Sequence, residues 1–250
     1  MLEITSLNKT FGGLQAVRDA SFIVAENKVT GLVGPNGAGK TTVFNMVTGT
    51  LPSDSGTIRF RGQDITATSA QERVGLGIAR TFQDVRLLGR LSVEDNVAVG
   101  VQNQRGESFL RNFLEPFAIH RWERLTMAKA HECLEFVGIT SERWHVPASS
   151  LSYGEQKLVS IARLLATDAQ MLLLDEPTSG LDEASLDQFR AVLARLIGDG
   201  RTVLVVEHNM LLVRELCDVA VFMATGQVLA IDVPAVLMEK EELREVYFGA

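Results

Sequence analysis

The stretch GPNGAGKTT, residues 34–42, decides the fold expected of this chain. It follows the apolar run VTGLV at 29–33 and fits the pattern G-x-x-x-x-G-K-[ST]. Glycines allow successive backbone N–H groups to turn inward as an anion-binding nest, and the start of the following helix adds partial positive charge. A simple glycine-rich turn would not require Lys40 and Thr41 together. The stretch therefore predicts a phosphate-binding loop between a strand and a helix.

This loop supplies most of the candidate nucleotide-binding residues. Lys40 is expected to reach the terminal phosphates of ATP, and the hydroxyl group of Thr41 is suited to Mg²⁺. ATP and Mg²⁺ are therefore the expected cofactors. The other candidates in the loop are Gly34, Pro35, Asn36, Gly37, Ala38, Gly39 and Thr42.

Composition narrows the class of protein. With 250 residues, 46% of them hydrophobic, the chain can bury a core as one large domain or two subdomains. Its 24 basic and 31 acidic residues give a net charge of −7, so we expect no nucleic acid among its partners. Cys133 and Cys217 match no metal or redox spacing and are expected to be buried, apolar side chains in a reducing compartment. Because secretory and membrane-spanning signals are lacking, we expect a soluble protein.

Short apolar segments alternate with helical ones along much of the chain. Strands are predicted at residues 2–4, 21–24, 29–33, 57–60, 78–82, 171–174, 202–206 and 219–223. Helices are predicted at residues 40–48, 153–166, 186–197 and 211–216, and the middle, from about 92 to 167, is mostly helical. This alternation predicts an α/β fold with a largely parallel sheet covered on both faces.

The segment MLLLDEP, residues 171–177, is an apolar strand that ends in two carboxylates. Ligands of open parallel sheets bind beyond the carboxyl ends of the strands. Asp175 is therefore a candidate Mg²⁺ ligand, directly or through water, and Glu176 is a candidate base for an attacking water. The alternative is that the two carboxylates are only solvated residues at the start of a loop. It is disfavoured because the same sequence also contains a phosphate-binding loop, which such carboxylates would serve.

The segment LSYGEQK, residues 151–157, begins another helix. Ser152 and Glu155 form the S-x-x-E pattern of a capping box, which would be a sufficient structural role. The same helix start offers a hydroxyl group and a glycine, Ser152 and Gly154, to a phosphate. One nucleotide does not easily need two such helix ends from one chain, whereas two chains facing each other could share them.

Taken together, the motifs resemble those of the ATP-binding cassette (ABC) ATPases, and the likeness covers essentially the whole chain. They stand in the family's order: the Walker A loop at 34–41, a Q-loop glutamine at Gln83 in RTFQ, the signature at 151–156, the Walker B residues Asp175 and Glu176, the D-loop SGLD at 179–182, and the switch histidine His208 in VVEHNM.

The resemblance implies a role for each residue. Phe11 would stack on adenine, Gln83 would sense the γ-phosphate and Mg²⁺, and Lys40 would hold the phosphates. Glu176 would be the catalytic base, and His208 would contact the γ-phosphate. From the opposite subunit, Ser152 and Gly154 would bind that phosphate, and Asp182 would help to couple the two sites.

The resemblance also implies the architecture. Residues 1–250 would form a single ABC ATPase domain of the P-loop NTPase class, with an N-terminal antiparallel β subdomain, a RecA-like core sheet and a helical subdomain. Residues of about 1–84 and 168–250 would form the core, and residues of about 85–167 the helical subdomain with the signature.

The signature departs from the family's usual LSGGQ. Tyr153 replaces the second glycine, and Glu155 replaces the glutamine. Glu155 puts a carboxylate near the incoming phosphate unless Lys157 or the N–H groups of the helix cap neutralise it.

A finer resemblance concerns the task of the ATPase. Residues 78–100, a long middle segment of about 102–126 and the C-terminal LREVYFGA look like those of branched-chain amino acid importers. This implies a second ABC ATPase subunit, identical or different, two membrane permease subunits and, indirectly, a substrate-binding protein. The chain would then be cytoplasmic and peripheral on the inner face of the cell membrane of a bacterium or archaeon. Urea and amide importers, and lipopolysaccharide export ATPases, are similar.

Soluble ABC ATPases form the competing class. DNA-repair members carry a long coiled coil and translation-type members carry two cassettes, and neither feature is found in this sequence. An Fe–S assembly ATPase is the nearest single-cassette alternative. A simple P-loop kinase would not need LSYGEQ, SGLD and His208.

A stripe of phenylalanines, Phe109, Phe113 and Phe117, is interpreted as the buried face of a helix or as the border of a permease-docking groove.

Overall fold

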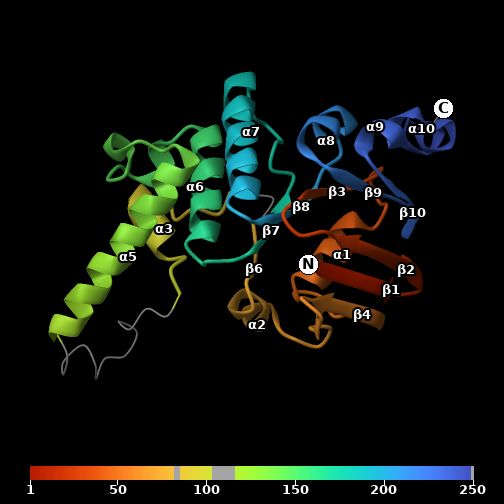
Figure 1. Ribbon diagram of the computed structural model, residues 1–250, viewed down its shortest axis with the longest axis horizontal. Coiled ribbons are helices and arrows are strands. Elements are labelled where there is room, and N and C mark those ends of the chain that lie inside the picture. The colour runs from red at the N-terminus through yellow and green to blue at the C-terminus, as the bar shows by residue number, and fades with distance from the viewer. Residues whose placement is uncertain (82–84, 103–115, 249–250) are drawn as a thin grey trace. The chain divides into compact units, whose positions relative to one another are not determined.

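The computed structural model describes residues 1–81, 85–102 and 116–248 (Figure 1). Its contacts divide the chain into two compact units. Unit 1 comprises Met1–Gln83, Gln170–Pro177 and Leu193–Ala250, and unit 2 comprises Asp84–Ala169 and Thr178–Val192. Each unit is therefore assembled from segments that are distant in the sequence.

Unit 1 contains a four-stranded antiparallel sheet in the order β2-β1-β4-β5. The strands are β1 (Leu2–Phe11), β2 (Leu14–Val24), β4 (Ser55–Phe60) and β5 (Gln63–Asp64). Gly12 and Gly13 both have positive φ, as a tight β1–β2 hairpin requires. The predicted strands 2–4 and 21–24 were therefore too short, because the hairpin extends both of them to its turn.

The second sheet of unit 1 has six strands in the order β10-β9-β3-β8-β7-β6. They are β3 (Val29–Val33), β6 (Ile78–Arg80), β7 (Met171–Asp175), β8 (Thr202–Val206), β9 (Val219–Ala224) and β10 (Gln227–Asp232). All pairs are parallel except β9–β10. Every residue of β3, β7 and β8 is buried, as expected of a sheet covered on both faces. The prediction of a largely parallel sheet is confirmed.

Helix α1 (Lys40–Val47) connects the cores of the two sheets. Its Val43, Phe44 and Val47 are fully buried in one cluster with Leu2 of β1 and Leu204 of β8. Burying such side chains stabilises a fold by about 1.5–3 kcal/mol each. The phosphate-binding loop thus leads into a helix with a firm apolar base. The described helices that lie wholly in unit 1 also include α2 (Ala70–Gly75), α8 (Met210–Leu216), α9 (Pro234–Glu239) and α10 (Glu241–Phe248).

Unit 2 is helical. In its described residues the helices are α3 (Val93–Ala98), α5 (Pro116–Val137), α6 (Tyr153–Leu165) and the first turns of α7 (Glu183–Gly198) (Figure 1). Two 3₁₀ turns lie at Ser141–Arg143 and Ala148–Ser150. Trp144 donates from its indole nitrogen to the carbonyl oxygen of Ile139 at 3.0 Å, and its ring stacks on His131 at 4.1 Å between centroids. The helical middle that was expected is confirmed in the described residues of this unit.

None of the helices in the described part of the chain has both the length and the apolar character needed to cross a bilayer.

Candidate nucleotide-binding site

The loop between β3 and α1 has the backbone geometry that its glycines predict. Gly34, Gly37 and Gly39 have φ values of 143°, 79° and 95°. A Cβ atom on Gly34 would collide with the carbonyl oxygen of Met223, and one on Gly39 would lie 2.5 Å from that of Ala16. Since both positive φ and close approach favour glycine, these positions need it for the loop to form.

Lys40 begins α1 and lies over the loop. Its ammonium group donates to the carbonyl oxygens of Gly34 at 2.7 Å and Pro35 at 2.9 Å. Only 7% of the residue is exposed. Burial lowers the pKa of Lys40, while the carboxylates of Glu176 and Asp175 act in the opposite direction. A cation that is partly desolvated in this way interacts strongly with a phosphate.

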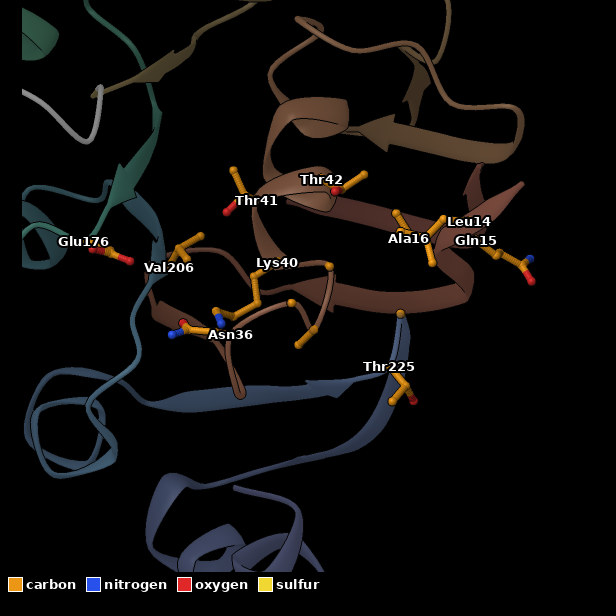
Figure 2. A pocket seen from close by; sticks show the side chains of 14 residues that line it. Leu14, Gln15, Ala16, Asn36, Lys40, Thr41, Thr42, Glu176, Val206 and Thr225 are labelled. Atoms are coloured by element: carbon orange, nitrogen blue, oxygen red, sulfur yellow. The ribbon is translucent and has the colours of Figure 1, made fainter. Parts of the chain in front are cut away.

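A cavity of about 530 Å³ opens above the loop (Figure 2). The phosphate-binding loop and the start of α1 form its floor, and Glu176 and Val206 lie at one end. Residues of the β1–β2 hairpin and of the β9–β10 turn line the opposite end. Its lining residues outside the loop and α1 are Leu14, Gln15, Ala16, Glu176, Val206, Thr225 and Gly226. The volume falls within the range of about 300–1,000 Å³ that is usual for small-molecule sites.

Asp175 ends β7 and is 7% exposed. Its backbone N–H group donates to the hydroxyl oxygen of Thr81 at 3.2 Å. Burial and the neighbouring Glu176 raise the pKa of the Asp175 carboxyl group, and the nearby Arg80 and Lys40 oppose this change. A buried carboxyl group of this kind is well suited to a cationic ligand.

Glu176 and His208 lie together beyond the ends of β7 and β8. The Nδ1 atom of His208 is 3.6 Å from Oε1 of Glu176. Glu176 has a φ of 45°, in the left-handed region, and its N–H group donates to the carbonyl oxygen of Val206 at 3.0 Å. The structure thus brings Lys40, Asp175, Glu176 and His208 to one edge of the sheet, as the sequence predicts for strand-end residues.

Other predicted residues lie outside the cavity lining. Phe11 ends β1 and is 46% exposed, and its hairpin partner Leu14 lines the cavity in its place. The ammonium group of Lys9 lies 5.6 Å from the centroid of the Phe11 ring. Gln83, Phe109, Phe113 and the side chain of Phe117 fall outside the described residues.

The signature residues belong to unit 2. Ser152 caps α6: its hydroxyl oxygen accepts from the N–H group of Glu155 at 3.3 Å, and its own N–H group donates to Oε2 of Glu155 at 2.8 Å. The predicted capping box is therefore present. Gly154 follows in the first turn of α6, and Asp182 accepts from the N–H group of Ser185 at 2.8 Å, at the start of α7.

Of the two predicted partners of the Glu155 carboxylate, the N–H group of the helix cap is confirmed, because Ser152 N–H donates to it, and Lys157 is wrong. Arg143 takes the place expected of Lys157: its Nε and Nη2 atoms donate to the two carboxylate oxygens of Glu155 at 3.0 and 2.9 Å. This contact with Arg143 lowers the pKa of Glu155. Lys157 donates to the carbonyl oxygen of Ser179 at 2.7 Å.

Sequence reasoning missed two arginines that hold α1. Arg73 is 2% exposed and donates to the carbonyl oxygens of Met46 and Val47, at 2.6 and 2.7 Å. Arg80 donates to the side chains of Asn45 at 2.9 Å and Thr48 at 3.1 Å. The missed helix α2, which carries Arg73, has a capping box of Ser69 and Glu72 that the S-x-x-E pattern could have revealed.

A glycine-rich loop before a helix, a buried lysine and a carboxylate pair at a parallel strand end define a P-loop nucleotide-binding protein. The family model described as "ABC transporter" matches residues 17–179. The chain belongs to the ABC transporter family, and within it is an ATP-binding cassette with ATPase activity.

Individual relatives agree with this assignment. The chain is 36% identical over 250 residues to the high-affinity branched-chain amino acid transport ATP-binding protein BraF of Pseudomonas aeruginosa, covering 100% of this chain and 98% of BraF. It is 32% identical over 249 residues to the lipopolysaccharide export system ATP-binding protein LptB of Haemophilus influenzae, covering 100% and 97%. The ADP conformation of an ABC transporter cassette matches with a TM-score of 0.86 and 30% identity, covering 100% and 99%.

Proposed function

We propose that this chain hydrolyses ATP to power an importer of branched-chain or other hydrophobic amino acids or amides. Full-length similarity to BraF supports the amino-acid assignment. The observation that carries the proposal is the placement of Lys40 and Glu176 on the same cavity, with His208 beside Glu176. The whole chain acts as one ABC ATPase domain, in which unit 2 is the helical subdomain and unit 1 the core.

ATP binds with its phosphates on the loop and its base toward the β1–β2 hairpin. The N–H groups of the loop and the N-terminus of α1 face the phosphates, and Lys40 supplies the cation. The nearby Phe11 ring, together with Leu14 and Gln15, contacts the adenine. Stacking on an aromatic ring contributes about 1–3 kcal/mol per base.

The donor set of this chain fits Mg²⁺. Hard divalent cations prefer oxygen ligands, and Thr41 and Asp175 offer a hydroxyl group and a carboxylate. Burial and the neighbouring Glu176 raise the pKa of Asp175, and a bound cation would act in the opposite direction. When bound, Mg²⁺ neutralises charge on the phosphate oxygens. Gln83 is proposed as a further ligand on the family's pattern.

Glu176 acts as the general base. The carboxylate orients a water molecule and takes its proton while the water oxygen bonds to the γ-phosphorus and the bond to the β–γ bridging oxygen breaks. His208 lies close enough to Glu176 to orient the carboxylate. Its contact with the γ-phosphate is proposed on the family's pattern. Lys40 holds the charge that develops on the phosphates.

A second ATPase subunit completes the site. Ser152 lies exposed at the N-terminus of α6. Gly154 is buried in the first turn, and its contact with the phosphate is proposed on the family's pattern. One chain uses the N-terminus of α1 for its own nucleotide, so α6 serves the nucleotide of the partner, and Asp182 couples the two sites. ATP binding closes the pair of ATPase subunits, and this movement is passed to two membrane permease subunits. A substrate-binding protein delivers the solute to the permeases. The pair is peripheral on the cytoplasmic face of the cell membrane.

The variant Glu176→Gln tests the mechanism. Loss of the base should reduce ATP turnover by about 100-fold or more, with ATP affinity retained. Its mass by light scattering should rise from monomer to dimer when Mg-ATP is added. Glu3→Gln, on the exposed face of β1, is the matched control and should behave like the parent. Parent-like turnover of Glu176→Gln would exclude the assigned base.

Transport assays test the biological task. Cells that lack the chain should lose uptake of labelled branched-chain amino acids or amides, and the parent chain should co-sediment with membranes. Unchanged uptake with defective lipopolysaccharide delivery would favour the export alternative suggested by LptB. A chain that stays in the soluble fraction would favour an Fe–S assembly factor.

A further inference from the structure

Within unit 2, the start of α6 packs against residues 179–185. Lys157 donates from its ammonium group to the carbonyl oxygen of Ser179 at 2.7 Å. The ring of Tyr153 lies against Gly180, where a Cβ atom would be 3.1 Å from Cε1 of the tyrosine. Gly154 is so close to Ser185 that a Cβ atom on it would collide with the Ser185 side chain. Segments that are far apart in the sequence thus form one surface.

Lys157 is the buried part of this contact. The residue is 6% exposed, and its ammonium group lies 5.2 Å from the centroid of the Tyr153 ring. A buried ammonium group is costly without partners, and a carbonyl oxygen together with an aromatic face provides them. The lysine therefore ties the Tyr153 ring and the Ser179 backbone to the same point.

Gly180 allows the tyrosine ring to lie this close. Its φ of 74° is in the left-handed region, and it has no side chain to displace the ring. Tyr153, Ser179, Gly180 and Asp182 are all exposed, so the contact lies at the surface of unit 2. Asp182 is also held, through its bond to the N–H group of Ser185.

We propose that Lys157 and Tyr153 are positioning residues that hold residues 179–182 against the signature helix α6. Ser152 and Asp182 are then presented to the second subunit as one rigid surface. The inference rests on the proposed shared site and extends it. It also gives Tyr153 a purpose: the ring fills the space over Gly180 that a glycine at position 153 would leave open.

Hydrogen–deuterium exchange of the nucleotide-free monomer tests directly whether Lys157 and Tyr153 hold residues 179–182 against α6. Lys157→Met keeps the apolar stem but loses the bond to Ser179, and Tyr153→Gly removes the ring. Both variants should exchange amides in residues 178–183 about tenfold faster than the parent, as expected for loss of one charged hydrogen bond or one aromatic contact. Tyr153→Phe keeps the ring and should match the parent.

Lys129→Met is the matched control, because Lys129 is a lysine of the same unit that pairs with Asp168. It should leave residues 178–183 unchanged. Parent-like exchange in Lys157→Met and Tyr153→Gly would overturn the proposal. Faster exchange spread over all of unit 2 would also overturn it, because the residues would then be structural only.

A second measurement separates this proposal from the proposed function. In the Glu176→Gln background, Lys157→Met should leave the nucleotide affinity of the monomer within about twofold and weaken the ATP-driven dimer by about tenfold. An unweakened dimer would overturn the positioning role. If Glu176→Gln stays monomeric with Mg-ATP, a pair of identical subunits is excluded, and the exchange result alone upholds or overturns the contact between Lys157, Tyr153 and residues 179–182.

Discussion

Replacing Arg73 by methionine should strongly destabilise unit 1. The guanidinium group donates to the carbonyl oxygens of Met46, Val47 and Ile65 at 2.6, 2.7 and 2.6 Å, and to the hydroxyl oxygen of Thr68 at 3.0 Å. The carbonyl groups at the end of a helix have no partners within the helix and carry partial negative charge. Arg73 therefore serves as the C-terminal cap of α1, the helix that begins with Lys40.

The magnitude follows from these bonds. A hydrogen bond to a charged group contributes about 1.5–3 kcal/mol, and a buried polar group left unsatisfied costs about 1–3 kcal/mol. Removing the buried guanidinium group offsets part of this loss, because its desolvation cost disappears as well. We therefore expect Arg73→Met to lower the free energy of unfolding by about 3–5 kcal/mol. Methionine fills much of the vacated volume, so the loss is mainly polar.

Urea denaturation followed by far-UV circular dichroism measures this loss. Arg59→Met is the matched control, because Arg59 lies on the exposed face of β4, and it should change stability by no more than about 0.5 kcal/mol. Arg73→Lys keeps the charge but not the forked donors, so it should fall between the two. A loss below about 1 kcal/mol for Arg73→Met would refute the reasoning, because the bonds from Arg73 would then contribute little to the stability of unit 1.

Three further changes test other parts of the structure. Gly39→Ala forces a side chain onto a φ of 95° and toward the carbonyl oxygen of Ala16, so calorimetry should show weaker ATP binding, and thermal unfolding should show a stability loss of about 1–3 kcal/mol. Gly75→Ala is the control, because the space around Gly75 is open. Parent-like behaviour of Gly39→Ala would contradict the loop geometry. Burial raises the pKa of the Cys217 thiol to about 12, so iodoacetamide should not modify Cys217 in the native chain at neutral pH. Peptide mapping should find the residue modified only when the chain is treated in urea. Labelling of the native chain would argue against the burial of Cys217. Arg143 lowers the pKa of Glu155 below its ordinary value of 4.5, so this pair stabilises the fold above that pH and ceases to do so as the pH falls through the lowered pKa. The difference in Tm between the parent and Arg143→Met should therefore shrink on acidification below 4.5. A constant difference would contradict the pairing.

The phosphate-binding loop and the carboxylates at the end of β7 could be predicted because their signals are local. Spacing alone specifies glycine turns, a helix start and a strand end. The lengths of β1 and β2 could not be predicted, since register shifts and the positive φ values of Ser6 and Asp19 interrupt the alternation of buried and exposed residues.

Long-range partners were the other limit. Nothing near Glu155 in the sequence distinguishes Arg143 from Lys157 as its partner, because the choice depends on how the 3₁₀ turn at Ser141–Arg143 packs. The edge strand β10 was missed because Leu229 and Ile231 are exposed, so its pattern resembles neither a buried strand nor a polar loop. The helices α9 and α10 that follow it were missed although each has a start signal, Pro234 at the start of α9 and Glu241 and Glu242 in the first turn of α10.

The central position of β3 has a consequence for how the chain is made. β3 ends at Val33, but both of its neighbours, β8 and β9, begin only at Thr202 and Val219. During synthesis the apolar β3 therefore leaves the ribosome long before any strand can pair with it. Such non-local pairing is slow, and an unpaired apolar strand is prone to aggregate. The nucleotide site is thus among the last parts of the molecule to form, and the nascent chain offers an early binding segment to chaperones.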